Sequence, residues 1–435
     1  MTVKQNVRYP SGGSRIRPTF VAVPALASVP LLWAVIPCSA ARPETPWHLG
    51  DLQAAPRVFP AAAPREAGMR ALFFEGLPWQ GKPTLVFAWY GSPPHKRRKR
   101  LPAVVLVHGG NGTAFADWVK LWNDRGYAAL AIDTCGSMPS RGFGEPPGLE
   151  HRPRHAFAGP PCWDASFDQV DWPVEDQWTF HAVADIILAN SLLRSFPEVD
   201  PHRIGITGIS WGGYLTAIAA SVDLRFRFAV PVYGCGFLGE NSAWVPDFKK
   251  MGEANAQKWL ALWDPSVYLR RASMPFLWVS GTNDFAYPLD SLQKSYLLPR
   301  GPRTLSIRVR MPHGHGGPGE KPDEIRAFAD QITQSGKPLA AIRSQGVHGR
   351  KAWVVYKSGV AIRRAELTYT TDTGVWKDRQ WRATPAELDS STHQVSARLP
   401  PGVTVYYFNL VDQRGLVVSS EHRSAESSDS NASLQ

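Results

Sequence analysis

The sequence predicts a doubly wound, mostly parallel α/β sheet followed by a small all-β sandwich. Two observations predict the sheet. Short, continuously apolar segments recur along the first three quarters of the chain, and segments with helical periodicity separate them. A third observation predicts the sandwich, because from about residue 339 the pattern changes to short strands separated by turn signals such as Thr371–Gly374.

The N-terminus has the pattern of an export signal. Four basic residues precede an apolar run over Phe20–Ile36 that contains two prolines, and Cys38–Ala40 supplies small residues for cleavage. The prolines and the short run argue against a stable membrane span. We therefore expect an exported protein, periplasmic or secreted, divided into an export signal over 1–40, an irregular segment over 41–68, an α/β domain over 69–336, the sandwich over 339–425 and a disordered tail over 426–435.

Charge and cysteine content exclude some classes of function. Loss of the leader lowers the formal net charge from +11 to about +7, and part of the remainder lies in a basic cluster over 95–100. We interpret this cluster as a solvated loop rather than a contact for an acidic polymer, and we expect no nucleic-acid binding.

Export would permit a Cys135–Cys162 disulfide. The chain has no C-x-x-C or His-rich spacing, so we expect no metal and no cofactor.

The elements of the α/β part follow one another in alternation. A hairpin is predicted over 69–74 and 84–90, later apolar strands over 103–107, 127–133, 203–207, 228–233 and 275–281, and an alternating strand over 305–311. Helices are predicted over 117–125, 176–193, 213–220 and 322–332. Two Trp-bearing excursions, 134–173 and 237–272, follow strand ends and should shape a substrate site. In the sandwich, strands are predicted over 351–356, 365–370, 394–399, 403–410 and 416–420.

A Gly-Ile-Ser-Trp-Gly string over Gly208–Gly212 lies between a predicted strand and a predicted helix. In this context the G-x-S-x-G pattern indicates a tight turn that holds the hydroxyl of Ser210 above the sheet as a nucleophile. The alternative is a glycine-rich turn in which the serine only caps the helix.

Partners for this serine follow other predicted strands, at the edge where ligands bind on parallel sheets. Asp284 follows the strand over 275–281, and two histidines follow the next strand. A serine hydroxyl needs a base and an orienting acid, and the order serine, aspartate, histidine fits that need. The base is ambiguous: we favour His315, which follows a glycine, with His313 as the alternative. The backbone N–H of Gly110 or Asn111, together with that of Trp211, would form an oxyanion hole.

Together, Val107–Asn111, Gly208–Gly212, Gly281–Asp284 and Met311–Gly316 resemble the α/β-hydrolase superfamily. They are most similar to its branch of dienelactone hydrolases and acetylxylan esterases, which adjoins the prolyl-oligopeptidase-type peptidases. The resemblance covers about residues 70 to 335. It implies the α/β-hydrolase fold, with Ser210 as nucleophile, Asp284 as acid and His315 as base, and hydrolysis of a carboxylic ester such as an acetyl ester of a polysaccharide. Classical dienelactone hydrolases use a cysteine nucleophile, so turnover of dienelactones is not expected.

Two other functions remain open at this point. One is a serine peptidase of the prolyl-oligopeptidase type. The other is a glycan- or partner-binding protein whose hydrolase domain is degenerate, although the complete set of Ser210, Asp284 and a histidine argues against it. For the sandwich we favour a structural role, packed on the α/β domain, over independent glycan binding.

Overall fold

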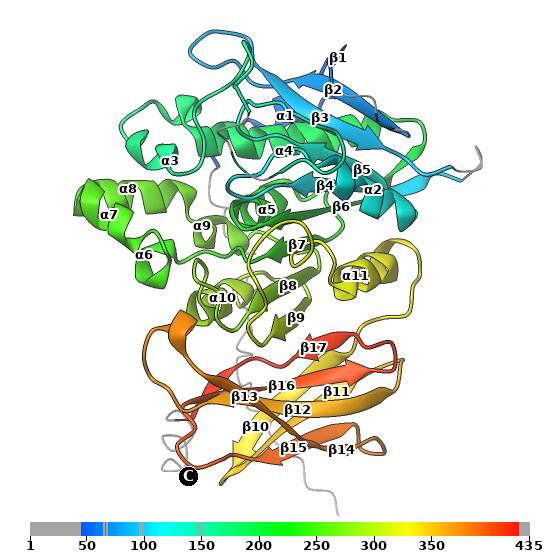
Figure 1. The fold of residues 1–435 in the computed structure, drawn as a ribbon, viewed down its shortest axis with the longest axis vertical. Coiled ribbons are helices and arrows are strands. Elements are labelled where there is room, and N and C mark those ends of the chain that lie inside the picture. Colours follow the sequence, from blue (N-terminus) through cyan, green and yellow to red (C-terminus); the bar gives the residue numbers. More distant parts are fainter. Residues whose placement is uncertain are drawn as a thin grey trace, which may run out of the picture. The chain divides into compact units, whose positions relative to one another are not determined.

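The computed structural model describes residues 45–63, 66, 68–94, 99–146, 148 and 152–425. The predicted export signal, the C-terminal tail and most of the basic cluster lie outside these residues. Figure 1 shows a large sheet with helices on both faces and two further sheets formed by the C-terminal strands. The predicted fold class is confirmed.

The large sheet has nine strands in the order β1-β2-β3-β5-β4-β6-β7-β8-β9. The predicted hairpin is present and antiparallel, whereas pairing from β5 to β9 is parallel throughout. The strands are β1 (Val58–Pro60), β2 (Met69–Glu75), β3 (Leu85–Gly91), β4 (Leu101–Val107), β5 (Ala128–Ile132), β6 (Val199–Ile209), β7 (Ala229–Val232), β8 (Phe276–Gly281) and β9 (Arg303–Arg308).

Helices flank both faces of this sheet, with α2 and α11 to one side in Figure 1 and α5 and α10 to the other. The central strands β5, β7 and β8 are buried at every residue, which is the reason that they are apolar without alternation. The longer helices are α2 (Ala116–Asp124), α4 (Trp178–Ser195), α5 (Trp211–Val222), α8 (Glu253–Trp263), α10 (Leu289–Tyr296) and α11 (Asp323–Thr333). The shorter ones are α1 (Leu49–Leu52), α3 (Ala165–Asp168), α6 (Leu238–Asn241), α7 (Val245–Met251) and α9 (Ser266–Leu269), with 3₁₀ turns at Val174–Asp176 and Trp376–Asp378.

The segment over 41–68, predicted to be irregular, contains α1 and β1 in its described part, and β1 pairs with β2. This segment also covers α4: the indole N–H of Trp47 donates to the carbonyl of Phe180, and the Ser191 hydroxyl donates to the carbonyl of Leu52. Because of this cover, α4 is buried around its whole circumference from Trp178 to Leu193.

The C-terminal strands form two antiparallel sheets, as the sequence predicted. One sheet has the order β10-β11-β15-β14, and the other has β13-β12-β16-β17 with β18 also paired to β16. The strands are β10 (Ala341–His348), β11 (Lys351–Lys357), β12 (Ile362–Thr370), β13 (Trp381–Pro385), β14 (Glu387–Asp389), β15 (Gln394–Arg398), β16 (Val405–Asp412), β17 (Val417–Ser419) and β18 (Arg423–Ser424). The sequence missed β10, β13, β14 and β18.

Strand β16 explains how the sandwich attaches to the α/β domain. All of its residues are buried, although a strand in either sheet of a sandwich normally has one solvated face. The Asn409 amide and the Tyr407 hydroxyl donate to the carbonyl of Ile307 in β9, at 3.2 and 3.4 Å. One face of β16 therefore packs within the sandwich and the other against the large sheet.

The Cys135–Cys162 disulfide that export would permit is not formed. Cys135, Cys162 and Cys235 are free thiols, although the Cys135 side chain contacts that of Cys162. Burial raises the pKa of the Cys135 thiol, which favours the protonated form.

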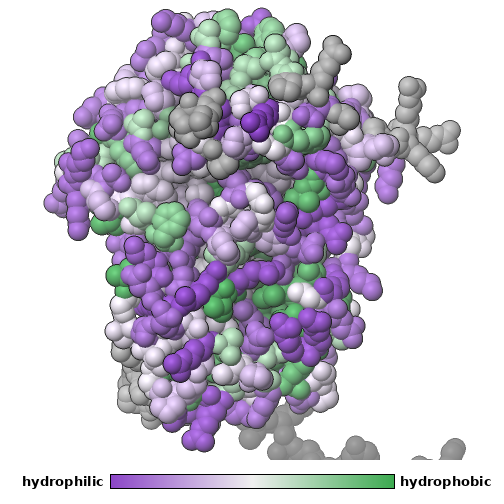
Figure 2. Space-filling view, viewed as in Figure 1, coloured by the Kyte–Doolittle hydropathy of each residue, from purple (hydrophilic) through white to green (hydrophobic). Residues whose placement is uncertain are grey.

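In the part of the chain that the structure describes, no helix combines the length and apolarity needed to span a bilayer. Figure 2 shows mainly hydrophilic residues on one face, with apolar ones in small, scattered groups.

Candidate active site

Ser210 occupies the turn between β6 and α5, and its backbone is strained. Its φ of 58° and ψ of −119° lie in a region that residues with a side chain rarely adopt. The two glycines of the motif make this turn possible, because a Cβ at Gly208 would lie 2.1 Å from the Gly212 carbonyl oxygen, and one at Gly212 would lie 2.0 Å from the Val107 carbonyl oxygen. The geometry is that of the predicted nucleophile turn.

Asp284 lies three residues beyond the end of β8 and is buried. One carboxylate oxygen accepts the N–H groups of Ala286 and Tyr287, at 2.9 and 2.8 Å. The other lies 2.7 Å from Nδ1 of His313. A carboxylate fixed in this way holds the Nδ1 proton of the imidazole and leaves Nε2 available to a substrate or a hydroxyl.

Two aromatic rings hold the imidazole of His313. The ring of Tyr233 stacks on it at 4.5 Å, and that of Phe285 lies 4.8 Å away in a tilted arrangement. The Tyr233 hydroxyl also donates to the carbonyl of Pro312, at 2.7 Å, and burial raises the pKa of this phenol, so that it stays a donor. Neither aromatic residue was among the predicted site residues, although Tyr233 ends the strand predicted over 228–233 and Phe285 directly follows Asp284.

His315 has different partners. Its Nε2 accepts the backbone N–H of Gly109 at 2.9 Å, so its proton is on Nδ1, which donates to Glu320 at 2.9 Å. Burial raises the pKa of the Glu320 carboxyl, but hydrogen bonds from His315 and the N–H groups of Gly316 and Gly317 outweigh burial and hold the pKa below its usual range. Both nitrogens of His315 are thus occupied. The contact with Asp284 belongs to His313, the alternative, and not to the histidine that the sequence favoured.

The turn after β4 lies beside the N-terminus of α5. A Cβ at Gly110 would lie 3.3 Å from the Trp211 indole. Asn111 has a positive φ of 57°, and its carbonyl accepts from the N–H of Gly148 at 2.8 Å and from the Arg152 guanidinium at 2.7 Å. Trp211 is the first residue of α5, where backbone N–H groups lack intrahelical partners. The elements expected to form the oxyanion hole are therefore adjacent.

One cavity of about 1080 Å³ is lined by Ser210, Gly110, Asn111, Trp211 and both histidines, among others. Its aromatic wall consists of Phe115, Trp118, Trp163, Trp211, Trp244 and Phe285. Phe285 is 57% exposed. Asp164 also lines the cavity, and burial raises the pKa of its carboxyl group. Trp163 and Asp164 come from the first predicted excursion and Trp244 from the second, so both excursions shape the cavity as expected.

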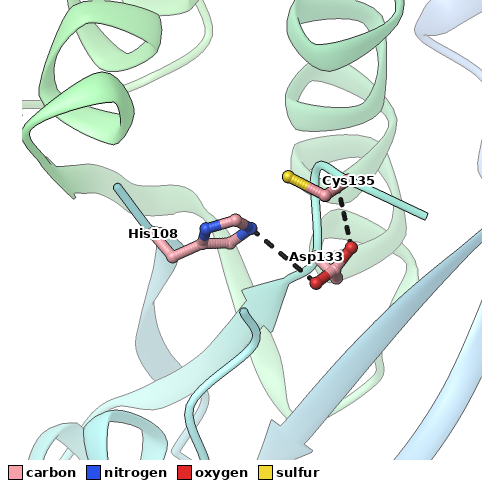
Figure 3. A group of neighbouring side chains, drawn as sticks. All are labelled: His108, Asp133 and Cys135. Carbon is pink, nitrogen blue, oxygen red and sulfur yellow. Dashed lines mark hydrogen bonds and ion pairs between the residues drawn. The ribbon is translucent and has the colours of Figure 1, made fainter. Parts of the chain in front are cut away.

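A second cluster consists of His108, which directly follows β4, with Asp133 and Cys135, which follow β5; possible ligand atoms lie within 4.8 Å of one another (Figure 3). The histidine and carboxylate donors of this cluster are already engaged in hydrogen bonds within the protein. His108 donates from Nδ1 to the carbonyl of Gly109 and accepts the N–H of Thr134 at Nε2. The Asp133 carboxylate accepts two backbone N–H groups and a hydroxyl, from Cys135, Ser137 and Thr113. These bonds, with a protonated Cys135, suit a structural network better than a metal ion.

Two family models match parts of this chain. A family model described as acetyl xylan esterase matches residues 69–243, and one described as prolyl oligopeptidase family matches residues 172–334. Among solved structures, an acetyl xylan esterase from a Paenibacillus species is 21% identical, with a TM-score of 0.50 over 67% of this chain and 97% of the other.

Two further structures are also similar. An acetyl xylan esterase from a Thermoanaerobacterium species is 17% identical, with a TM-score of 0.49 over 67% of this chain and 93% of the other. An acylaminoacyl peptidase from Pyrococcus horikoshii is 22% identical, with a TM-score of 0.45 over 62% of this chain and 43% of the other. The predicted resemblance to the α/β-hydrolase superfamily is confirmed.

Proposed function

We propose that this protein of the α/β-hydrolase superfamily is a serine hydrolase that cleaves a carboxylic ester, with Ser210 as nucleophile, His313 as base and Asp284 as acid. One observation carries the proposal. A serine on a strained turn and a histidine paired with a buried aspartate line the same cavity. Backbone strain of this kind persists where the surrounding structure imposes it, and it concentrates at functional sites.

The reaction follows from this geometry. His313 takes the proton of Ser210 at Nε2 while the serine oxygen attacks the ester carbonyl, and Asp284 stabilises the imidazolium that forms. The N–H of Trp211, with that of Gly110 or Asn111, stabilises the negative oxygen of the tetrahedral intermediate. The imidazolium then protonates the departing alcohol. Water, activated in the same way, releases the acid from the acyl-enzyme and regenerates the hydroxyl of Ser210.

In this proposal His315 is a positioning residue for the oxyanion turn. Its bond to the Gly109 N–H fixes the first peptide of that turn, and Glu320 fixes the ring and its tautomer. Arg152 fixes the other end of the turn through the carbonyl of Asn111. A preorganised oxyanion hole needs such supports, because its donors must already be in place when charge develops.

For the substrate we propose an acetyl ester of a carbohydrate, acted on outside the cytoplasm. The match to the acetyl xylan esterase model supports the ester, and the aromatic wall of the cavity supports a sugar, since indole and phenyl rings cover the apolar faces of pyranoses. The apolar N-terminal run supports export.

The test is turnover of an activated acetyl ester and of acetylated xylan by the mature protein and by Ser210→Ala. We expect hydrolysis of both esters by the unaltered protein and a loss of about 10⁴-fold or more in the variant, with an unchanged unfolding temperature. Full activity in the variant would exclude the nucleophile assignment.

Peptide bond hydrolysis is the second candidate, favoured by the match of residues 172–334 to the prolyl oligopeptidase family. Peptide anilides in the same assay distinguish the two. Faster cleavage of the anilide than of the ester would reverse the preferred order. Absence of any turnover, with retained binding of glycans, would instead favour the binding protein with a degenerate hydrolase domain.

A further inference from the structure

We propose that the C-terminal sandwich is part of the catalytic apparatus, because its loop over 371–380 positions the catalytic acid through Asn283. The inference rests on the proposed role of Asp284. It assigns a function to the sandwich that packing alone would not require. Asn283 is a positioning residue in this account, since it acts on the reaction only through its neighbour.

The side chain of Asn283 spans the two domains. Its amide nitrogen donates to the carbonyls of Lys377 and Arg379, at 2.9 and 2.8 Å. Its amide oxygen accepts the Thr282 hydroxyl at 2.8 Å. Both amide protons and the oxygen are therefore engaged, which fixes the orientation of the amide.

The supporting loop is itself held firmly. The Arg379 guanidinium lies 3.7 Å above the ring of Trp376 and donates from Nε to the carbonyl of Gly374. The ring of Trp376 is stacked with the ring of Trp381, which is buried in the sandwich. The ring of Trp376 also contacts that of His422. A loop with its own packed aromatic centre can serve as a fixed support, whereas a solvated loop could not.

In the chain, Asn283 lies between Thr282 and the catalytic acid Asp284. Thr282 accepts the N–H of Arg310 at its hydroxyl, and the Arg310 side chain contacts Gln380 of the same sandwich loop. The loops that carry Asp284 and His313 are thus both tied to the sandwich, one on each side of the acid–base contact of 2.7 Å. Loss of the Asn283 bonds should let Asp284 move by a fraction of an ångström, which is enough to slow a reaction that depends on alignment.

The experiment compares Asn283→Ala with Gln293→Ala. Gln293 makes a similar amide bond across the same domain boundary, to the carbonyl of His422 at 2.8 Å, but it lies on α10 away from the cavity. With an activated acetyl ester we expect Asn283→Ala to lower kcat about tenfold with KM changed less than about twofold. Gln293→Ala should lose a similar amount of thermal stability and keep its kcat. Equal kcat values in the two variants would overturn the proposal.

A double-mutant cycle tests whether Asn283 affects catalysis through Asp284. If Asn283 acts through Asp284, Asn283→Ala should lower the residual kcat of Asp284→Asn by less than about twofold. A full, additive loss in that background would show that Asn283 acts elsewhere and would overturn the proposal. If Asp284→Asn retained full turnover, the acid assignment itself would fail, so the failure of the premise is distinguishable from the failure of this inference.

Discussion

At the scale of single residues, the site depends on contacts too short to tolerate an added atom. In the turn around Ser210, the carbonyl of Gly212 occupies the space that a side chain at Gly208 would need. The carbonyl of Val107 occupies the space that a side chain at Gly212 would need. The backbone of Ser210 is strained, so the surrounding packing has to hold it. The two motif glycines are consequently requirements of the fold as well as of the proposed chemistry.

This packing predicts the effect of a single methyl group. Gly208→Ala would put a Cβ 2.1 Å from a backbone oxygen that cannot move without displacing α5. We expect a loss of about 2–4 kcal/mol in the free energy of unfolding, measured in urea, together with a loss of ester hydrolysis. Gly50→Ala is the matched control, since nothing lies within 4 Å of a Cβ there, and its stability should change by less than about 0.5 kcal/mol. Wild-type stability in Gly208→Ala would contradict the account of the turn.

At the scale of elements, the sequence could assign the loops that carry the site residues. It could not decide which residue within a loop contacts the other members of the site. Buried strands such as β8 show as apolar runs, so Asp284 could be placed at a strand end before the fold was known. His313 and His315 lie in one loop and differ by two residues, and only the partners decide between them. Glu320, which engages His315, follows five residues later in a stretch without periodicity.

Other elements were missed because their signals come from distant contacts. The strand β1 and the helix α1 are short and are stabilised by β2 and α4, so local propensity does not reveal them. The strand order, with β5 between β3 and β4, depends on crossovers that a sequence pattern does not encode. The role proposed for Asn283 belongs here too, because Lys377 and Arg379 are about ninety residues away in the chain.

At the scale of the whole molecule, buried neutral histidines link stability to pH. Burial lowers the pKa of His108 to about 4 and that of His181 to about 4, and both side chains are almost fully enclosed. In the unfolded chain these groups titrate near pH 6.5, so between about pH 6.5 and about pH 4 the unfolded state binds more protons. The contribution of these two histidines to stability therefore falls as the pH decreases through this window.

We expect the free energy of unfolding to be lower at about pH 5 than at about pH 7 by an amount on the order of 1–2 kcal/mol for each of these histidines. Urea titrations at the two pH values measure the difference. His181→Gln should reduce it, because the glutamine does not titrate. An equal pH dependence in His181→Gln and in the unaltered protein would contradict the burial of a neutral His181.

The central claim is that Ser210 is activated by His313, which Asp284 orients, while His315 supports the oxyanion turn. The most direct measurement is the rate of covalent labelling by a fluorophosphonate, followed by peptide mass spectrometry, since this reagent needs an activated serine and no knowledge of the natural substrate. We predict a single adduct on Ser210, formed about 10³-fold more slowly or worse in His313→Ala and only about 10–100-fold more slowly in His315→Ala. Labelling that is lost in His315→Ala but retained in His313→Ala, or an adduct on another residue, would contradict the account.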